Sequence, residues 1–274
     1  MSSAEAPSDD DEGADDDEIG LDDVRDSVVD HFDERTWDVT EAALSAHATL
    51  LLDDQECFGL VIVGPSGSGK TTALKFFEGL DEVYVSDEAT PASFVTHDAS
   101  RETRELEDID LLPRIRHKTM LTPDMANWFS GATDSIEDKM ATLANVMDGD
   151  GYTRDSGTHG QRGYDGDYGF NFIGASTPLD RRAWDTMGHT GNRFVFHEKQ
   201  DVGVDTVARG VFSDDSYGEK VDSCTELVGS FLAELWIEHD GYRGVEWDSE
   251  VDDDVKDNLM YLAQIVQYAR APLW

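Results

Sequence analysis

The sequence predicts an α/β fold built around a central parallel sheet. Short apolar segments with the character of strands alternate with segments of helical periodicity, which is typical of parallel βαβ units. One such segment, Phe58–Val63, is mostly apolar, as expected for a strand that is covered on both faces. A glycine-rich stretch and then a helical segment follow it directly, so the chain is expected to turn tightly from a strand into a helix there.

The remaining elements follow from the spacing of the apolar residues. Strands are expected over residues 58–63, 83–86, 118–122, 170–175 and 193–196. Helices are expected over residues 24–32, 40–52, 71–79, 106–114, 136–147, 224–238 and 255–269. Residues 1–22 are acidic and contain neither Lys nor Arg, which indicates a disordered tail. We therefore expect a tail over 1–22, a core with a helical lead-in over 23–200, and a helical region over 201–274.

The composition is acidic along the whole chain. Sixty Asp and Glu residues against 21 Lys and Arg give a formal net charge of −39. Repulsion on this scale destabilises a compact state unless salt screens it, and the composition resembles that of proteins from extreme halophiles. At molar salt the Debye length shrinks to ~3 Å, so the negative charge does not exclude a nucleic-acid partner.

The composition also excludes several classes of protein. With 39% hydrophobic residues the chain has enough apolar material for a core, which excludes a wholly disordered protein. No apolar run approaches the ~18 residues of a membrane span, and the start of the chain lacks the pattern of a secretory signal. Two cysteines are too few for a disulfide framework or a zinc site. We therefore expect a cytoplasmic protein without a membrane partner.

The strongest functional signal is Gly64–Thr71, GPSGSGKT, which matches the phosphate-binding pattern G-x-x-x-x-G-K-[ST] in full. Gly67 and Gly69 allow a tight turn whose N–H groups point at phosphate oxygens. Lys70 is expected to reach the β- and γ-phosphates, and the Thr71 hydroxyl to ligate magnesium. The expected nucleotide-binding residues are Gly64, Pro65, Ser66, Gly67, Ser68, Gly69, Lys70, Thr71 and Thr72. This loop predicts a P-loop protein that binds a nucleoside triphosphate, with ATP and Mg²⁺ as the expected ligands.

A second magnesium ligand is expected at the end of a later strand, and Asp124 is the candidate. The match is incomplete, because Pro123 is unusual in a central strand and no Glu follows Asp124. Asp87 and Glu88, after the second strand, are alternative acids for positioning the attacking water. Asp124 also fits the N-cap of an exposed Thr-Pro-Asp turn, so the identity of the catalytic base stays open.

The order of these motifs resembles that of AAA+ ATPases, in which a Walker A loop precedes a Walker B acid, a sensor-1 polar residue and an arginine finger. The resemblance implies that Asp124 is the Walker B acid, Thr177 is sensor 1, and Arg193 is the finger that serves a neighbouring subunit. Arg193 equally fits a surface arginine paired with one of the many acids. The resemblance also implies a helical lid, for which this chain offers an abbreviated or truncated segment with Arg270 as a weak sensor-2 candidate.

A long insertion, Gly149–Gly169, precedes the strand expected at 170–175. It resembles the pre-sensor-1 hairpin of minichromosome-maintenance helicases, magnesium chelatases and MoxR-like ATPases, which in the helicases grips DNA inside a ring. By this resemblance Arg162 and Tyr164, expected near the tip, would offer DNA a phosphate contact and a stacking face. A flexible surface loop is the alternative interpretation.

Two stretches, SDEATPASFVTH and GYDGDYGFNFIGASTP, are similar to stretches of uncharacterised P-loop NTPases from viruses and mobile elements. Together these features predict a P-loop NTPase three-layer sandwich, AAA+-like, with a helical C-terminal segment and a disordered acidic tail. The expected function is that of an oligomeric ATPase that remodels or translocates DNA or protein. Two alternatives stay open: a phosphotransferase acting on a small metabolite, and a nucleotide-binding switch or scaffold with little turnover.

Overall fold

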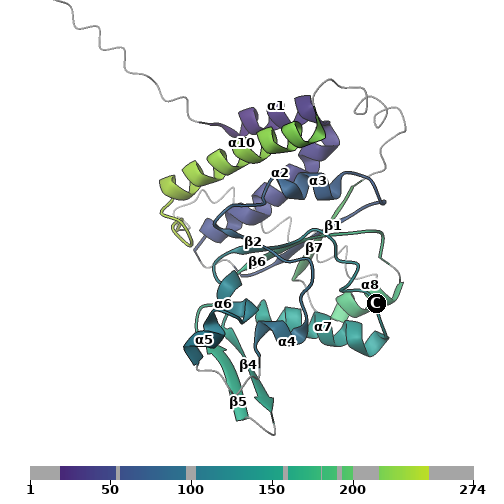
Figure 1. Cartoon of the computed structure of the whole chain (residues 1–274), viewed down its shortest axis with the longest axis vertical. Helices are drawn as coiled ribbons and strands as arrows, with labels where there is room; N and C mark the ends of the chain where they lie inside the picture. The colour runs from purple at the N-terminus through teal and green to yellow at the C-terminus, as the bar shows by residue number, and fades with distance from the viewer. Residues whose placement is uncertain are drawn as a thin grey trace, which may run out of the picture.

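A five-stranded parallel sheet lies at the centre of the protein (Figure 1). The computed structural model describes residues 19–53, 56–96, 103–156, 160–179, 181–189, 193–199 and 216–246. The strands are β1 (Gly59–Val63), β2 (Val83–Val85), β3 (Thr119–Thr122), β6 (Asn171–Ser176) and β7 (Phe194–Glu198). Their order across the sheet is β2-β3-β6-β1-β7 and every neighbouring pair is parallel, so β1 lies between β6 and β7.

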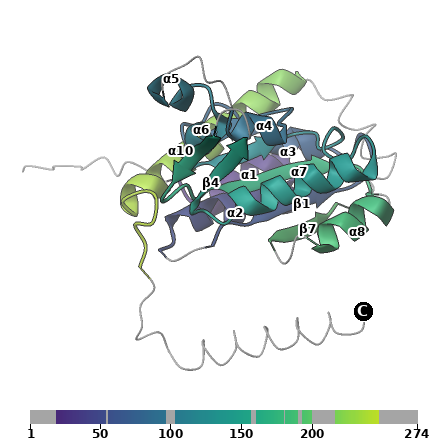
Figure 2. The same ribbon diagram turned by 90° about the horizontal axis from the view of Figure 1, so that it is seen from below.

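Helices cover both faces of the sheet and make the structure a three-layer sandwich. One layer contains α1 (Leu21–His31), α2 (Glu34–Ala48), α3 (Lys70–Lys75) and α10 (Tyr217–Glu238), with the short 3₁₀ helix η1 (Thr49–Leu51) after α2. The opposite layer contains α4 (Pro91–Phe94), α6 (Leu111–Ile115) and α7 (Thr133–Val146), and Figure 2 looks onto this side. The other helices are α5 (Thr103–Glu107) and α8 (Arg181–His189).

The interior strand β1 is buried on both faces, which explains its apolar sequence. Leu60 and Ile62 pack into the core under α1, α2, α3 and α10, whereas Val61 and Val63 pack into the core on the opposite face. Successive side chains of a strand point to opposite faces, so a strand between two helical layers needs apolar residues at every position. The predicted fold class, an α/β sandwich around a parallel sheet, is confirmed, and each strand lies within two residues of its expected bounds.

The helix boundaries differ more from the expectation, because capping and buried polar contacts decide them. Helix α2 begins six residues early, where the Asp33 carboxylate accepts a hydrogen bond of 2.7 Å from the Thr36 N–H. The single helix expected over 106–114 is divided into α5 and α6 at Asp110. Asp110 is buried, and its carboxylate accepts hydrogen bonds from the Thr96 N–H at 2.9 Å and from a tyrosine of the insertion described next.

The insertion before β6 forms an antiparallel hairpin of β4 (Gly151–Ser156) and β5 (Gly160–Asp165), as the resemblance implied. Its register pairs Tyr152 with Tyr164 and Arg154 with Arg162. The hairpin projects from the layer that contains α4, α6 and α7 (Figure 1).

The C-terminal helix α10 packs against α1 and α3, and its Cys224 and Val228 join their core. The division of the chain at residue 200 stays a prediction. The tail before residue 19, the helix expected over 255–269 and Arg270 lie outside the described residues. Within the described ranges, no helix is long and apolar enough to cross a membrane.

Candidate nucleotide-binding site

The glycine-rich loop connects the end of the interior strand β1 to helix α3. Gly67 and Gly69 have φ angles of +77° and +83°, in the left-handed region that side chains other than glycine rarely adopt. The loop therefore uses these two glycines as the sequence predicted, to turn the backbone sharply at the carboxyl edge of the sheet.

Lys70 folds back over the loop that precedes it. Its side chain is only 7% exposed, and its ammonium donates hydrogen bonds of 2.7 Å to both Gly64 O and Pro65 O. A third hydrogen bond, of 3.3 Å, runs to Ser68 Oγ. Burial lowers the pKa of Lys70, and the negative charge of Asp124 partly opposes that shift. Asp124 therefore lies within electrostatic reach of the loop lysine.

Strand pairing brings Thr177 beside the same loop. Ser176, the last residue of β6, is in register with Val63, the last residue of β1. The Gly64 N–H donates a hydrogen bond of 3.1 Å to Ser176 O, so the loop and the end of β6 are tied together. Thr177 is the next residue and is exposed at this carboxyl edge. Its predicted contact with phosphate or with the attacking water stays a prediction.

Asp124 follows β3 on the other side of β6. The Met125 N–H donates a hydrogen bond of 2.8 Å to Ala175 O, which holds this segment against β6. Pro123 is tolerated because β3 ends one residue before it, so no bond of the strand is lost. The exposed Asp124 carboxylate accepts a hydrogen bond of 2.8 Å from the Ala126 N–H, so the turn geometry that the sequence allowed is present as well.

The alternative acids Asp87 and Glu88 are exposed beyond the end of β2. Strand β2 is at the edge of the sheet, three strands from β1, which corresponds to about 14 Å. Strand β3, which leads to Asp124, is two strands away, or about 10 Å. The strand order therefore favours Asp124 over Asp87 and Glu88 as the acid nearest the loop.

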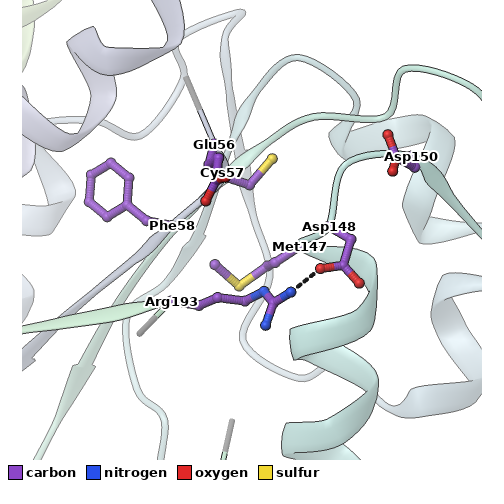
Figure 3. Close-up of a pocket in the computed structure, with 7 residues that line it drawn as sticks. All are labelled: Glu56, Cys57, Phe58, Met147, Asp148, Asp150 and Arg193. Atoms are coloured by element: carbon purple, nitrogen blue, oxygen red, sulfur yellow. Dashed lines mark hydrogen bonds and ion pairs between the residues drawn. The ribbon is translucent and has the colours of Figure 1, made fainter. Parts of the chain in front are cut away.

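Arg193 lies at the opposite, amino edge of the sheet. It precedes β7, and its carbonyl accepts a hydrogen bond of 2.6 Å from the N–H of Gly59, the first residue of β1. The length of β1, about 13 Å, separates this level from the loop. The Arg193 guanidinium forms an ion pair with Asp148 in a cavity of 560 Å³ (Figure 3). Arg193 therefore does not reach the loop of its own chain, and a finger role requires a second subunit.

Tyr164 does not lie where the sequence analysis expected it. It is 9% exposed, and its hydroxyl donates a hydrogen bond of 2.7 Å to the buried Asp110 carboxylate. Burial and this hydrogen bond raise its pKa. The expectation of an open stacking face near the tip is wrong for Tyr164, because strand alternation turns Tyr164 toward the core, with Tyr152 opposite it.

Arg162 is two residues nearer the tip, on the same face of the hairpin as Tyr164, and is half-buried. The opposite Arg154 donates a hydrogen bond of 3.0 Å to Pro91 O. The tip itself, residues 157–159, lies outside the described residues. A DNA contact by Arg162 stays a prediction.

Sequence reasoning missed Lys199, the residue that follows β7. Its N–H donates a hydrogen bond of 2.7 Å to Val63 O, so β7 brings it directly beside the start of the loop. Its side chain is 4% exposed, and burial lowers its pKa to about 8. The only signal in the sequence was a lysine three residues after the strand expected at 193–196, in a chain with seven lysines.

The fold and the loop define the class of the protein as an α/β fold of the P-loop NTPase type. No family model and no curated protein sequence matches the chain. Among solved structures, the apo form of the NrS-1 C-terminal region is 12% identical with a TM-score of 0.39, over 86% of this chain and 50% of that one. Two structures of the JCV helicase, one with a bound small molecule, are 13% and 12% identical with TM-scores of 0.33. These cover 78% of this chain and 62% and 61% of the helicase chains, so the chain spans half to about three fifths of each structure, and the likeness is confined to the general fold.

Proposed function

We propose that the protein binds ATP together with Mg²⁺ at Gly64–Thr71 and hydrolyses it. The observation that carries this proposal is the position of the GPSGSGKT loop between the buried strand β1 and α3. The ends of β6 and β3 bring Thr177 and Asp124 to the same edge of the sheet. In open parallel sheets, ligands bind outside the carboxyl ends of the strands, which is where these residues lie.

The loop offers the chemistry that a polyphosphate needs. Its backbone N–H groups and the Lys70 ammonium are hydrogen-bond donors. Among the described residues, no carboxylate lies within ion-pair distance of the Lys70 ammonium. When phosphate oxygens approach, Lys70 exchanges its bonds to the neutral carbonyl oxygens of Gly64 and Pro65 for bonds in which both donor and acceptor are charged.

The residues present also fit a magnesium ion. Mg²⁺ in such sites uses one or two protein oxygens together with water and substrate phosphates. Thr71 and Asp124 offer a hydroxyl and a carboxylate, both exposed, and the charge of Asp124 is felt by Lys70. Bound Mg²⁺ would supply positive charge that polarises the phosphoryl oxygens. The protein groups do the rest: Thr71 and Asp124 hold the ion, and Lys70 holds the phosphates.

Hydrolysis of the γ-phosphate depends mainly on positioning and charge. Thr177 orients the attacking water from the end of β6, and the Asp124 carboxylate, whose charge acts on Lys70, is the candidate acid for its proton. A neighbouring subunit supplies Arg193 as an arginine finger, since the Arg193 of the same chain lies at the opposite edge. The strand order and the hairpin before β6 support this AAA+-like arrangement, in which an oligomer remodels or translocates DNA or protein.

A switch or scaffold with little turnover is the second candidate. Two observations favour it: the Asp124 carboxylate already accepts a hydrogen bond from the Ala126 N–H, and no Glu follows Asp124. The phosphotransferase alternative needs a loop that closes over a second substrate. The hairpin is instead tied down by the bond from Tyr164 to Asp110.

The experiment is steady-state phosphate release at molar KCl with Mg²⁺, with and without single- and double-stranded DNA, using Lys70→Ala as the blank. Turnover that disappears in the blank supports the ATPase, and stimulation by DNA supports the motor. Tight ATP binding without turnover favours the switch. Equal phosphate release by wild type and Lys70→Ala would remove the loop from the reaction.

A further inference from the structure

Two lysines are buried in the described part of this acidic chain, and both lie at the glycine-rich loop. The described residues contain Lys70, Lys75, Lys118, Lys139, Lys199 and Lys220. Only Lys70 and Lys199 are buried, at 7% and 4% exposure. Lysine is rarely buried unless its charge is paired, so a second buried lysine beside the first requires an explanation.

The sheet fixes the backbone of Lys199 against the loop. Its N–H bonds to Val63 O at 2.7 Å, and a Cβ added to Gly64 would lie 2.8 Å from Lys199 O. The side chain then crosses the loop toward its other end. A Cβ added to Gly69 would lie 3.4 Å from Lys199 Nζ. The ammonium of Lys199 therefore lies over the last glycine before Lys70.

The ammonium of Lys199 has no hydrogen bond or ion pair with any residue that the structure describes. The negative charges of Asp33 and Asp38 act to raise the pKa of Lys199. Asp33 Oδ1, however, already accepts hydrogen bonds of 2.7 Å from both the N–H and the hydroxyl of Thr36. The positive charges of Lys70 and Arg35 repel the Lys199 ammonium and act to lower its pKa. A cation buried among these groups lowers stability, and proteins retain such costs mainly at functional sites.

We propose that Lys199 is a second phosphate-binding cation, which contacts the polyphosphate of a nucleoside di- or triphosphate across the loop from Lys70. This inference rests on the proposed function and adds a ligand-binding residue that the loop motif does not contain. The polyphosphate relieves two unfavourable features at once: the lack of a partner for Lys199 among the described residues, and the repulsion between the two ammonium groups. In this role Lys199 binds the ligand through its charge and takes no part in proton transfer.

The proposal separates a ligand-binding lysine from a structural one. Replacing a structural lysine lowers the stability of the free protein, whereas removing an unpartnered buried charge leaves it unchanged or raises it. Lys199→Met removes the charge and keeps a long apolar side chain. Lys75→Met is the matched control, because Lys75 lies in α3 with Lys70 but is half-buried over the Tyr217 ring, 5.8 Å from its centre.

The test is calorimetric titration of the full chain with MgATP and MgADP in molar KCl at neutral pH, combined with thermal unfolding without nucleotide. Lys199→Met is expected to weaken binding of both nucleotides at least tenfold, the ~1.4 kcal/mol that one hydrogen bond to a charged group supplies. Its melting temperature without nucleotide is expected to equal or exceed that of wild type, and Lys75→Met to bind within about twofold of wild type.

The outcomes distinguish this inference from the proposed function. If Lys70→Ala abolishes binding and Lys199→Met binds like wild type, the inference is wrong and the proposed function stands. If Lys199→Met unfolds or melts at a lower temperature, the lysine is structural and the inference is wrong again. If the wild type binds neither nucleotide, both proposals fail.

Discussion

Charged side chains have different kinds of partner at the two edges of the central sheet. At the amino edge, carboxylates have close basic partners: Asp148 pairs with Arg193, and Asp167 lies 3.6 Å from Arg243 and 3.1 Å from the imidazole of His117. At the carboxyl edge, Lys70 is bound by two carbonyl oxygens, and Lys199 has no hydrogen-bonding partner among the described residues. Charges that are already paired serve the structure, whereas buried cations without an ion-pair partner among the described residues leave a place for an anion.

The largest expected effect connects the two edges through a second subunit. Arg193→Ala should reduce ATP turnover by on the order of 10³-fold, because an arginine finger stabilises the charge of the transition state. Mixing Arg193→Ala with Lys70→Ala subunits should restore part of the activity, since each supplies what the other lacks. Phosphate release measures both effects. Arg181→Ala, an arginine 94% exposed on α8, is the control. Unchanged turnover and assembly in Arg193→Ala would mean that its pairing with Asp148 is its whole role.

A buried histidine near the amino edge gives the next effect, this time on stability. His47 contacts Thr119 Oγ1 at 2.8 Å and stacks on Trp236, and burial lowers its pKa from 6.5 to about 4. Above pH 6.5 it is neutral in both the folded and the unfolded state. As the pH falls toward 4, only the unfolded state takes up the proton, so about 3 kcal/mol of stability is lost.

Urea unfolding between pH 7 and pH 4 measures this loss for His47. The carboxylates contribute their own acid sensitivity, so the comparison is with His47→Gln, which cannot be protonated. Wild type should lose more stability than the variant over this range. Parallel pH profiles for the two proteins would contradict the assignment of His47 as a buried neutral histidine.

The hairpin provides a smaller effect that tests the corrected role of Tyr164. Tyr164→Phe leaves the buried Asp110 carboxylate with one donor fewer, which should cost about 2 kcal/mol of unfolding free energy. Tyr168→Phe, in the neighbouring half-buried tyrosine, should cost little. Denaturant unfolding of both variants decides the point. Equal stability of Tyr164→Phe and wild type would contradict the structural role assigned to the hydrogen bond between Tyr164 and Asp110.

The smallest effect concerns the carboxyl edge at high pH. With a pKa of about 8, Lys199 loses its proton between pH 7 and pH 9 in the free protein, so ATP affinity should fall severalfold over that range. The groups that act on it are Asp33, Asp38, Arg35 and Lys70. Titrations at three pH values measure the slope. The dependence of ATP affinity on pH should be weaker in Lys199→Met than in wild type. Equal pH dependence in the two proteins would assign the effect to another group.

The sheet and the loop were predictable from the sequence because both depend on short-range patterns. The apolar run of β1 and the GPSGSGKT spacing each lie within a few residues. Contacts between distant segments were not predictable. Tyr164 is buried because of the hairpin register, and Lys199 matters because β7 pairs with β1. A tyrosine in a polar insertion and a lysine after a strand carry no sequence signal that distinguishes these positions from exposed ones.

The central claim is that the carboxyl edge of the sheet binds a polyphosphate through its buried lysines. Equilibrium titration of the wild type and of Lys70→Ala with MgATP in molar KCl tests it most directly. Saturable binding by wild type with one nucleotide per chain, lost in a folded Lys70→Ala, is the predicted result. Equal binding by the two proteins, or no binding by the wild type, would contradict the account.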